Sequence, residues 1–226
     1  SSHHLSHCLY GLSVVENFSE YIYLSCDGVG EGETMSAYTI DSYYKIKKIW
    51  SNLYPNSLGL FYSTITDFLG FEINEGEFKV MSLSSFGKPK YENQLKKIFN
   101  IHNFKIDMDY FEFHKNLSRS FSQKLCDILG EPYLNLNENK NFKKYADIAC
   151  SAQLILEQAM QNIIKKVLKI SGKKKIVLTG GVALNCKMVH NLSKLNIFEE
   201  LIVPPSPGDS GSAIGAVVGL SSIPAG

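Results

Sequence analysis

The sequence from Tyr145 to Gly181 constrains the fold more than any other part of the chain. Apolar residues recur at helical spacing from Tyr145 to Ile170. A short run of apolar residues, Ile176–Thr179, follows and ends at Gly180-Gly181. A long amphipathic helix that leads into a buried strand and a glycine turn is typical of α/β proteins. The helix face that we expect to be buried comprises Ile148, Ala152, Leu156, Met160, Ile163 and Val167.

The segments on either side of this helix predict the order of the other elements. Three early segments have strand-like composition and are separated by short turns, which predicts an antiparallel meander: Tyr21–Ser25, Met35–Ile40 and Tyr43–Ile49. After the strand at 176–179 we expect a helix near Ala183–Leu195, a strand at Leu201–Val203 and a helix after Pro207. This order is that of a ribonuclease-H-like lobe, the building block of the actin, sugar-kinase and Hsp70 group of folds.

The middle of the chain predicts helical insertions in this lobe. Leu58–Leu69 and Phe121–Leu129 have helical spacing and end at glycines, which are common just after a helix. Leu95–Phe99 also resembles a helix, Phe71–Pro89 an irregular connection and Phe104–Phe113 a small hairpin. A length of 226 residues fits one domain or two small lobes.

Composition excludes several classes of protein. A hydrophobic fraction of 44% and a charged fraction of 20% are those of a globular protein, and a net charge of +1 disfavours a dedicated nucleic-acid surface. The longest apolar runs are too short to span a membrane. Five scattered cysteines without a CxxC pair disfavour a disulfide framework. We therefore expect a cytoplasmic protein with no nucleic-acid or membrane partner.

His3 and His7 are four residues apart, so on a helix both imidazoles face the same way and are able to share one metal ion. Two imidazoles together with carboxylates suit Fe(II), Zn or Mn better than Mg or Ca. The alternative is the remnant of a purification tag followed by a surface histidine, and the residues alone leave both interpretations open. His4 points elsewhere on such a helix.

Asp27 lies where a strand meets a glycine-rich turn, Gly28-Val29-Gly30. A carboxylate at the end of a strand is a frequent functional position, and the glycines allow a ligand to approach the backbone closely. An ordinary hairpin turn is the alternative, since Asp-Gly favours such turns.

Two further glycine-containing turns precede helices in the last third of the chain. Gly180-Gly181 joins the buried strand to the segment that contains Asn185, and such a turn is able to direct backbone N–H groups at a nucleotide. Gly208-Asp209 precedes the final helix. Close packing explains the first turn equally well, and Asp209 is also a good N-cap residue.

Together these motifs resemble the O-carbamoyltransferase family, which includes nodulation protein U and tobramycin carbamoyltransferase. The resemblance extends from residue 3 to about residue 220. Its motifs, in order, are His-His-Leu-Ser-His (3–7), Asp-Gly-Val-Gly-Glu (27–31), Gly-Glu-Phe-Lys-Val-Met (76–81), Gly-Gly-Val-Ala-Leu-Asn (180–185) and Gly-Asp-Ser-Gly (208–211).

The resemblance implies an ATP-dependent transfer of a carbamoyl group, through carbamoyl adenylate, to a hydroxyl of a small molecule or sugar. Carbamoyl phosphate and ATP would be the co-substrates. The implied metal ligands, for Fe(II) or else Zn or Mn, are His3, His7, Asp27 and Asp209. The implied binding residues for ATP or carbamoyl adenylate are Asp27, Gly28, Val29, Gly30, Gly180, Gly181, Asn185 and Gly208. No residue is assigned as the general base.

The resemblance also implies that residues 1–226 are a partial large domain, without the first lobe and the adenylating domain of the family, and that this part alone transfers no carbamoyl group. Two related families remain alternatives. The hydrogenase maturation enzymes typically have Asp-Gly-Thr-Gly-Tyr-Gly where Asp27–Gly32 stands, and the tRNA threonylcarbamoyl transferases have Ser-Gly-Gly-His-Thr, which is absent here. A non-catalytic nucleotide-binding lobe is the alternative from another class.

Overall fold

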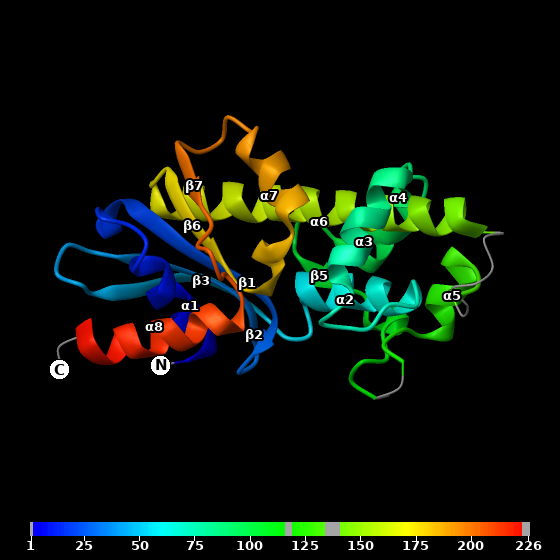
Figure 1. Cartoon of the computed structure of the whole chain (residues 1–226), viewed down its shortest axis with the longest axis horizontal. Helices are drawn as coiled ribbons and strands as arrows, with labels where there is room; N and C mark the ends of the chain where they lie inside the picture. The colour runs from blue at the N-terminus through cyan, green and yellow to red at the C-terminus, as the bar shows by residue number, and fades with distance from the viewer. Residues whose placement is uncertain (1, 116–118, 134–140, 223–226) are drawn as a thin grey trace. The chain divides into compact units, whose positions relative to one another are not determined.

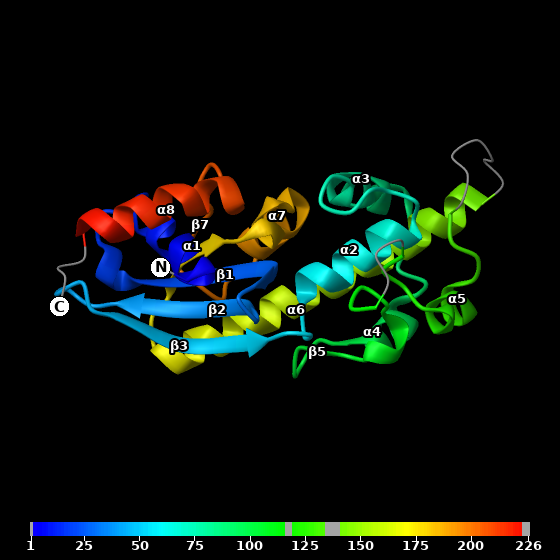
Figure 2. The same cartoon turned by 90° about the horizontal axis from the view of Figure 1, so that it is seen from below.

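The computed structural model describes residues 2–115, 119–133 and 141–222. These residues form two compact units. The first unit comprises Ser1–Gly59 and Gln161–Gly226, and the second comprises Leu60–Met160. Figures 1 and 2 show a sheet in the first unit and mainly helices in the second.

A five-stranded mixed sheet with the strand order β3-β2-β1-β6-β7 forms the centre of the first unit (Figure 2). β1 (Tyr21–Gly30), β2 (Glu33–Ile40) and β3 (Ile46–Leu53) are antiparallel neighbours. β6 (Lys175–Thr179) pairs parallel to β1, and β7 (Glu200–Ile202) pairs parallel to β6. The α/β class and the ribonuclease-H-like order predicted from the sequence are therefore confirmed.

Helices cover both faces of this sheet. α1 (His3–Leu12) packs on β1, β2 and β6, and α8 (Asp209–Ser222) packs on α1 (Figure 1). The last part of α6 (Phe142–Ser171) lies on the opposite face, where the ammonium of Lys166 lies 5.2 Å from the ring centre of Trp50 in β3. α7 (Cys186–Ser193) connects β6 to β7.

The second unit is built from helices, as predicted for the insertions. It contains α2 (Leu58–Phe68, which begins in the first unit), α3 (Glu77–Leu83), α4 (Glu92–Ile98), α5 (Gln123–Leu129) and the first part of α6. β4 (Phe99–Asn100) and β5 (Lys105–Ile106) form a two-stranded sheet. Gly70 and Gly130, which follow α2 and α5, have positive φ angles that favour glycine.

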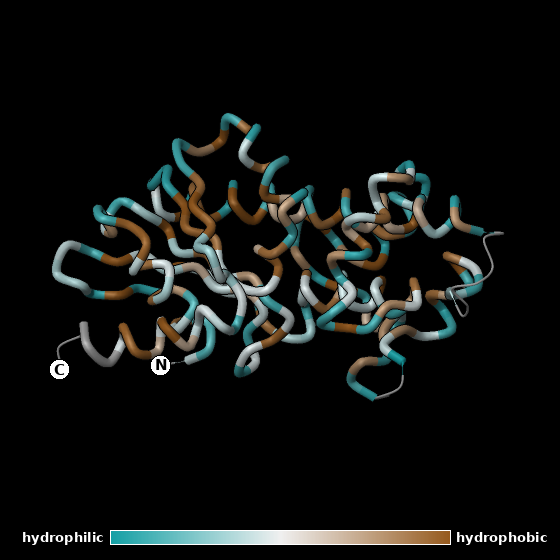
Figure 3. The backbone as a smooth tube through the Cα atoms, viewed as in Figure 1, coloured by the Kyte–Doolittle hydropathy of each residue, from teal (hydrophilic) through white to brown (hydrophobic). Residues whose placement is uncertain are grey.

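The apolar face predicted for the long helix is buried. Ile148, Ala152, Leu156, Met160, Ile163 and Val167 are each at most 1% exposed. The apolar strand β6 is buried at Ile176, Val177 and Leu178. Figure 3 shows the hydropathy of the same segments. β6 and β7 are largely hydrophobic, and many of the loops between elements are hydrophilic.

Two predictions for the sheet need correction. Asp27–Gly32 was predicted as a turn, but β1 continues to Gly30 through a register shift, and only Glu31 and Gly32 form the turn, with φ angles of 53° and 87°. β3 begins at Ile46 rather than Tyr43, because the Asp41 carboxylate accepts N–H groups of the preceding turn.

Three predictions for helices and hairpins also need correction. Phe71–Pro89 contains α3, a helix of seven residues that is too short for a clear period. The predicted hairpin at 104–113 forms instead between β5 and β4. The helix predicted at 183–195 divides into a 3-10 turn, Gly181–Leu184, and α7.

The five cysteines are free thiols, which agrees with the absence of a disulfide framework. None of the helices within the described ranges is both long and apolar enough to cross a membrane.

Candidate metal centre

Helix α1 places His3 and His7 on the same side, next to Asp27 of β1. The Nε2 atom of each imidazole lies 3.2 Å from Oδ2 of Asp27. Asp209, the first residue of α8, completes the group, with its Oδ1 atom 3.8 Å from His3 Nε2 and 3.4 Å from His7 Nε2. Four residues from three separate segments of the chain therefore converge on one point.

His7 has the environment of a ligand rather than of a surface residue. Its side chain is 0% exposed, so the interpretation as a surface histidine is wrong. Its Nδ1 atom is buried without a hydrogen-bond partner among the described residues, and its buried Nε2 atom faces only the two carboxylates. An unpartnered buried polar atom costs about 1–3 kcal/mol, and coordination of a metal ion through Nε2 would remove part of this penalty.

Asp27 owes its position to the parallel pairing of β1 with β6. Ser25 pairs with Thr179, so Asp27 and the Gly180-Gly181 turn follow at the same edge of the sheet. A Cβ atom on Gly181 would lie 3.0 Å from Asp27 Oδ1. Ligands in open α/β sheets bind at the carboxyl ends of the strands. The glycine segment that follows Asp27 and the Gly180-Gly181 turn therefore lie beside this carboxylate.

The electrostatics of the group favour an ionised Asp27. Burial alone would raise the pKa of Asp27, but the imidazoles of His3 and His7 and the N–H of Gly28 outweigh it, so that its pKa is well below the usual range. The hydrogen bond with Asp27 raises the pKa of His3 against the opposing effect of burial. A charged carboxylate beside imidazoles is the donor set that transition metals and zinc prefer.

The spacing of the four side chains also fits a metal ion. One ligand atom from each lies within 4.8 Å of the others. For metal–ligand distances of about 2.0–2.2 Å, the ligand atoms of a tetrahedral site are about 3.3–3.6 Å apart. The four nitrogen–oxygen distances of 3.2, 3.2, 3.4 and 3.8 Å lie around this range. The full set of separations among the four atoms extends to at most 4.8 Å, so the side chains would have to move closer together to surround one ion.

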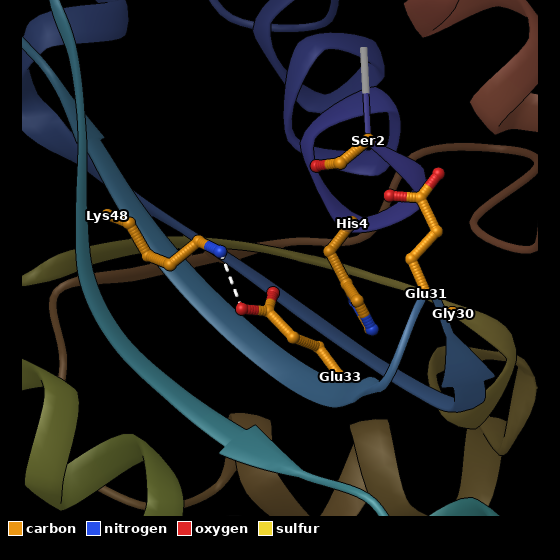
Figure 4. A pocket seen from close by; sticks show the side chains of 6 residues that line it. All are labelled: Ser2, His4, Gly30, Glu31, Glu33 and Lys48. Carbon is orange, nitrogen blue, oxygen red and sulfur yellow. Dashed lines mark hydrogen bonds and ion pairs between the residues drawn. The ribbon is translucent and has the colours of Figure 1, made fainter.

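His4 points away from this group, as its position on the helix predicts. Its Nδ1 atom lies 2.9 Å from Oγ of Ser25, in a hydrogen bond buried between α1 and β1. Burial lowers its pKa. His4 also lines a small polar pocket of about 210 Å³, shown in Figure 4, in which the Glu33–Lys48 ion pair lies on one side of His4 and Glu31 on the other. Ser2 and Gly30 complete its lining.

The other residues expected to bind the cofactor have different environments. Gly30 packs against the ring of His3, where a Cβ atom would overlap the imidazole. Gly180 has a φ angle of 89° and donates its N–H to the carbonyl of Pro207, which brings the loop containing Gly208 to the same place. The Asn185 side chain accepts the N–H of Met188 and caps α7. Gly28 follows Asp27 in β1, and Val29 is 47% exposed.

Sequence reasoning missed the residues that hold these groups in place. The buried hydroxyl of Ser57 donates to the carbonyls of Asp27 and Gly28, at 3.2 and 2.6 Å. A Cβ atom on Gly59 would lie 2.7 Å from the carbonyl oxygen of Asp27. The sequence contains one signal of such packing, the four-residue spacing of Gly211, Gly215 and Gly219 in α8.

Comparison with known proteins identifies the family. A sequence profile described as the carbamoyltransferase N-terminus matches residues 1–218. The chain belongs to the carbamoyltransferase family. The resemblance inferred from the ordered motifs is thereby confirmed.

Relatives of this carbamoyltransferase domain occur in distant organisms. An uncharacterized protein of Synechocystis is 32% identical over 97% of the chain and 36% of its own length. The nodulation protein NolNO of Sinorhizobium fredii is 27% identical over 98% of the chain and 31% of its own length. The chain thus spans about a third of the length of these curated relatives.

The fold has a counterpart among solved structures. The activator of 2-hydroxyisocaproyl-CoA dehydratase from Clostridium difficile, solved with bound ADPNP, superimposes with a TM-score of 0.56 at 16% identity, covering 95% of this chain and 64% of the activator. At this identity the similarity supports the fold alone.

Proposed function

We propose that residues 1–226 form part of the large domain of an ATP-dependent carbamoyltransferase. In this proposal His3, His7, Asp27 and Asp209 hold Fe(II), or else Zn or Mn, and the neighbouring glycine turns bind ATP or carbamoyl adenylate. The observation that carries the proposal is the convergence of these four side chains around the fully buried His7. A domain outside these residues would form carbamoyl adenylate from carbamoyl phosphate and ATP.

The bound metal would supply Lewis-acid chemistry, because a divalent ion polarises a phosphate or carbonyl oxygen and stabilises negative charge. The chain itself would supply shape and orientation. Gly181 leaves space beside the Asp27 carboxylate, and Gly180 adopts a backbone conformation that side chains disfavour. A phosphate is therefore able to approach the backbone at this edge of the sheet.

The proposed reaction transfers the carbamoyl group from adenylate to a hydroxyl. The hydroxyl oxygen attacks the carbamoyl carbon, a new carbon–oxygen bond forms, and the bond from that carbon to the phosphate oxygen breaks so that AMP leaves with the electron pair. The hydroxyl proton passes to solvent water in the same step. We suggest that the polar pocket around Glu31, Glu33 and Lys48 receives a part of the acceptor, because its lining both donates and accepts hydrogen bonds (Figure 4).

A titration with a non-hydrolysable carbamoyl-adenylate analogue tests the binding part of the proposal. Amide chemical shifts of the labelled chain would be followed with and without added Fe(II) or Zn(II). We expect metal-dependent shifts at Asp27, Gly180, Gly181 and Asp209. Shifts confined to regions distant from these residues would contradict the proposed site.

Carbamoyl transfer is tested on the full-length protein. Carbamoyl phosphate, ATP and a panel of sugar and small-molecule alcohols would be supplied, and carbamoylated product would be detected by mass spectrometry. We expect product from wild type and none from Asp27→Asn. A matched control is Asp41→Asn, which alters a carboxylate in an exposed turn of the same unit. Equal turnover by wild type and Asp27→Asn would contradict the proposal.

A further inference from the structure

Three of the four candidate metal ligands lie on two helices whose contact contains glycines, and the fourth, Asp27, lies on β1. His3 and His7 lie on α1, whereas Asp209 is the first residue of α8. The distances from Asp209 to the two imidazoles therefore depend on the separation of these helices. Helix axes usually lie 8–10 Å apart, and only small residues at the contact allow a closer approach.

Three glycines of α8, at intervals of four residues, face α1. A Cβ atom on Gly211 would overlap both the carbonyl oxygen of Ser206, in the loop before α8, and the ring of Tyr10. One on Gly219 would lie 2.6 Å from Cδ1 of Leu9. One on Gly215 would lie 2.6 Å from the backbone nitrogen of Tyr10 and would overlap the carbonyl oxygen of Ser6. Real Cβ atoms do not show such contacts, so an added methyl group would separate the helices.

The three positions differ in what opposes them. At Gly219 the opposing atom is the end of a flexible leucine side chain, which is able to move. At Gly215 both opposing atoms are backbone atoms of α1 between His3 and the end of that helix, and they move only if the helix moves. Gly215 is therefore the contact that determines the distance between the helices.

We infer that Gly215 is a positioning residue, which sets the distance between Asp209 and the imidazoles of His3 and His7. This inference rests on the proposed metal site. The Tyr10 hydroxyl supports the arrangement, because it accepts the N–H of Ser206 at 3.3 Å in the loop that leads to Asp209. The packing of α8 on α1 thus determines whether one metal ion is able to reach all four ligands.

The test compares Gly215→Ala with Gly219→Ala. Co(II) is the probe, because its visible absorption depends on the number and geometry of its ligands. Its affinity would be measured by competition with a chromogenic chelator. We expect Gly215→Ala to weaken binding at least tenfold and to change the absorption spectrum, whereas Gly219→Ala should remain within about twofold of wild type. Alanine is a better helix former than glycine, so weaker binding would not reflect loss of helix propensity.

The possible results distinguish a positioning role of Gly215 from loss of folding and from absence of the proposed metal site. Circular dichroism of the metal-free proteins reports folding, and Gly211→Ala provides a second variant if Gly215→Ala does not fold. Unchanged affinity and spectrum in a folded Gly215→Ala protein, or in Gly211→Ala where that variant replaces it, would overturn the inference and leave the site intact. No Co(II) binding by wild type would overturn the proposed site itself, and the inference with it.

Discussion

Asp27 in the first unit is a half-buried carboxylate and Asp147 in the second is a buried one, and their surroundings differ. Asp147 is 3% exposed and accepts the N–H of Lys88 at 2.7 Å, and its oxygens lie 2.8 and 3.4 Å from the ammonium groups of Lys90 and Lys143. All three partners belong to the second unit, and they supply hydrogen bonds and positive charge to both carboxylate oxygens of Asp147. Asp27 faces His3 and His7, and a neutral imidazole is able to coordinate a metal through a ring nitrogen.

The structural carboxylate Asp147 and the candidate ligand Asp27 differ in their neighbouring groups rather than in the direction of their pKa shifts. Burial would raise the pKa of Asp147, and the lysines and the Lys88 N–H outweigh it, so the pKa is lowered. The pKa of Asp27 is lowered as well, yet Nδ1 of its neighbour His7 is buried without a hydrogen-bond partner among the described residues. A lowered pKa alone therefore does not distinguish a candidate ligand from a structural carboxylate, whereas an unsatisfied neighbouring group favours the candidate ligand.

The largest expected effect is on the stability of the second unit. Leu156 is 1% exposed on α6, and Leu156→Ala should lower the free energy of unfolding by about 2–5 kcal/mol through lost burial and a cavity. Denaturant titration measures this change, and Leu184→Ala, at a position that is 64% exposed, is the control. A thermal midpoint equal to that of wild type would contradict our assignment of the buried face.

Replacing the satisfied carboxylate should have a smaller effect. Asp147→Asn should cost about 2 kcal/mol near pH 7, because it removes the charge that two lysines and a backbone N–H stabilise. The folded pKa is lowered, so this stabilisation is present above the unfolded pKa of about 3.9 and is lost as the pH falls through the folded value. The difference in stability between wild type and variant should therefore begin to shrink below about pH 4 and disappear only as the pH falls through the lowered folded pKa. A difference that does not depend on pH would contradict this account.

A still smaller effect is expected where a hydrogen bond joins α1 to β1. Ser25→Ala removes the partner of His4 Nδ1 and should cost about 1–2 kcal/mol. Because this bond fixes the rotation of α1, metal affinity should also fall several-fold. Ser13→Ala removes a hydrogen bond at the exposed end of the same helix and should change neither quantity. Equal metal affinities for wild type and Ser25→Ala would show that the bond is not needed for positioning.

Much of the fold could be predicted from sequence because its signals are local. The period of α6, the apolar run of β6 and the glycines after α2 and α5 each depend on neighbouring residues. The extension of β1 through Gly30 could not be predicted, because it depends on a bulge in its pairing with β2. The pairing of β4 with β5 depends equally on tertiary contacts.

The candidate site was predictable only in part. The four-residue spacing of His3 and His7 indicates a shared face, and the structure brings both residues to Asp27. Asp209 is distant in sequence and was connected to them through the family resemblance. We infer that its approach depends on Gly215, whereas Ser57 and Gly59 contact the backbone of Asp27, and all these contacts exist only after folding. The side-chain oxygen of Asn185 caps α7, and the expected contact of Asn185 with a ligand stays a prediction.

The metal content of the purified chain tests the central claim most directly. Elemental analysis would be made of wild type, His7→Ala and Asp209→Asn, with Asp147→Asn as the matched carboxylate control. Our account predicts about one iron or zinc ion per chain for wild type and for Asp147→Asn, and nearly none for the two site variants, because each loses one of the four ligands. Equal metal content in wild type, His7→Ala and Asp209→Asn would contradict the account.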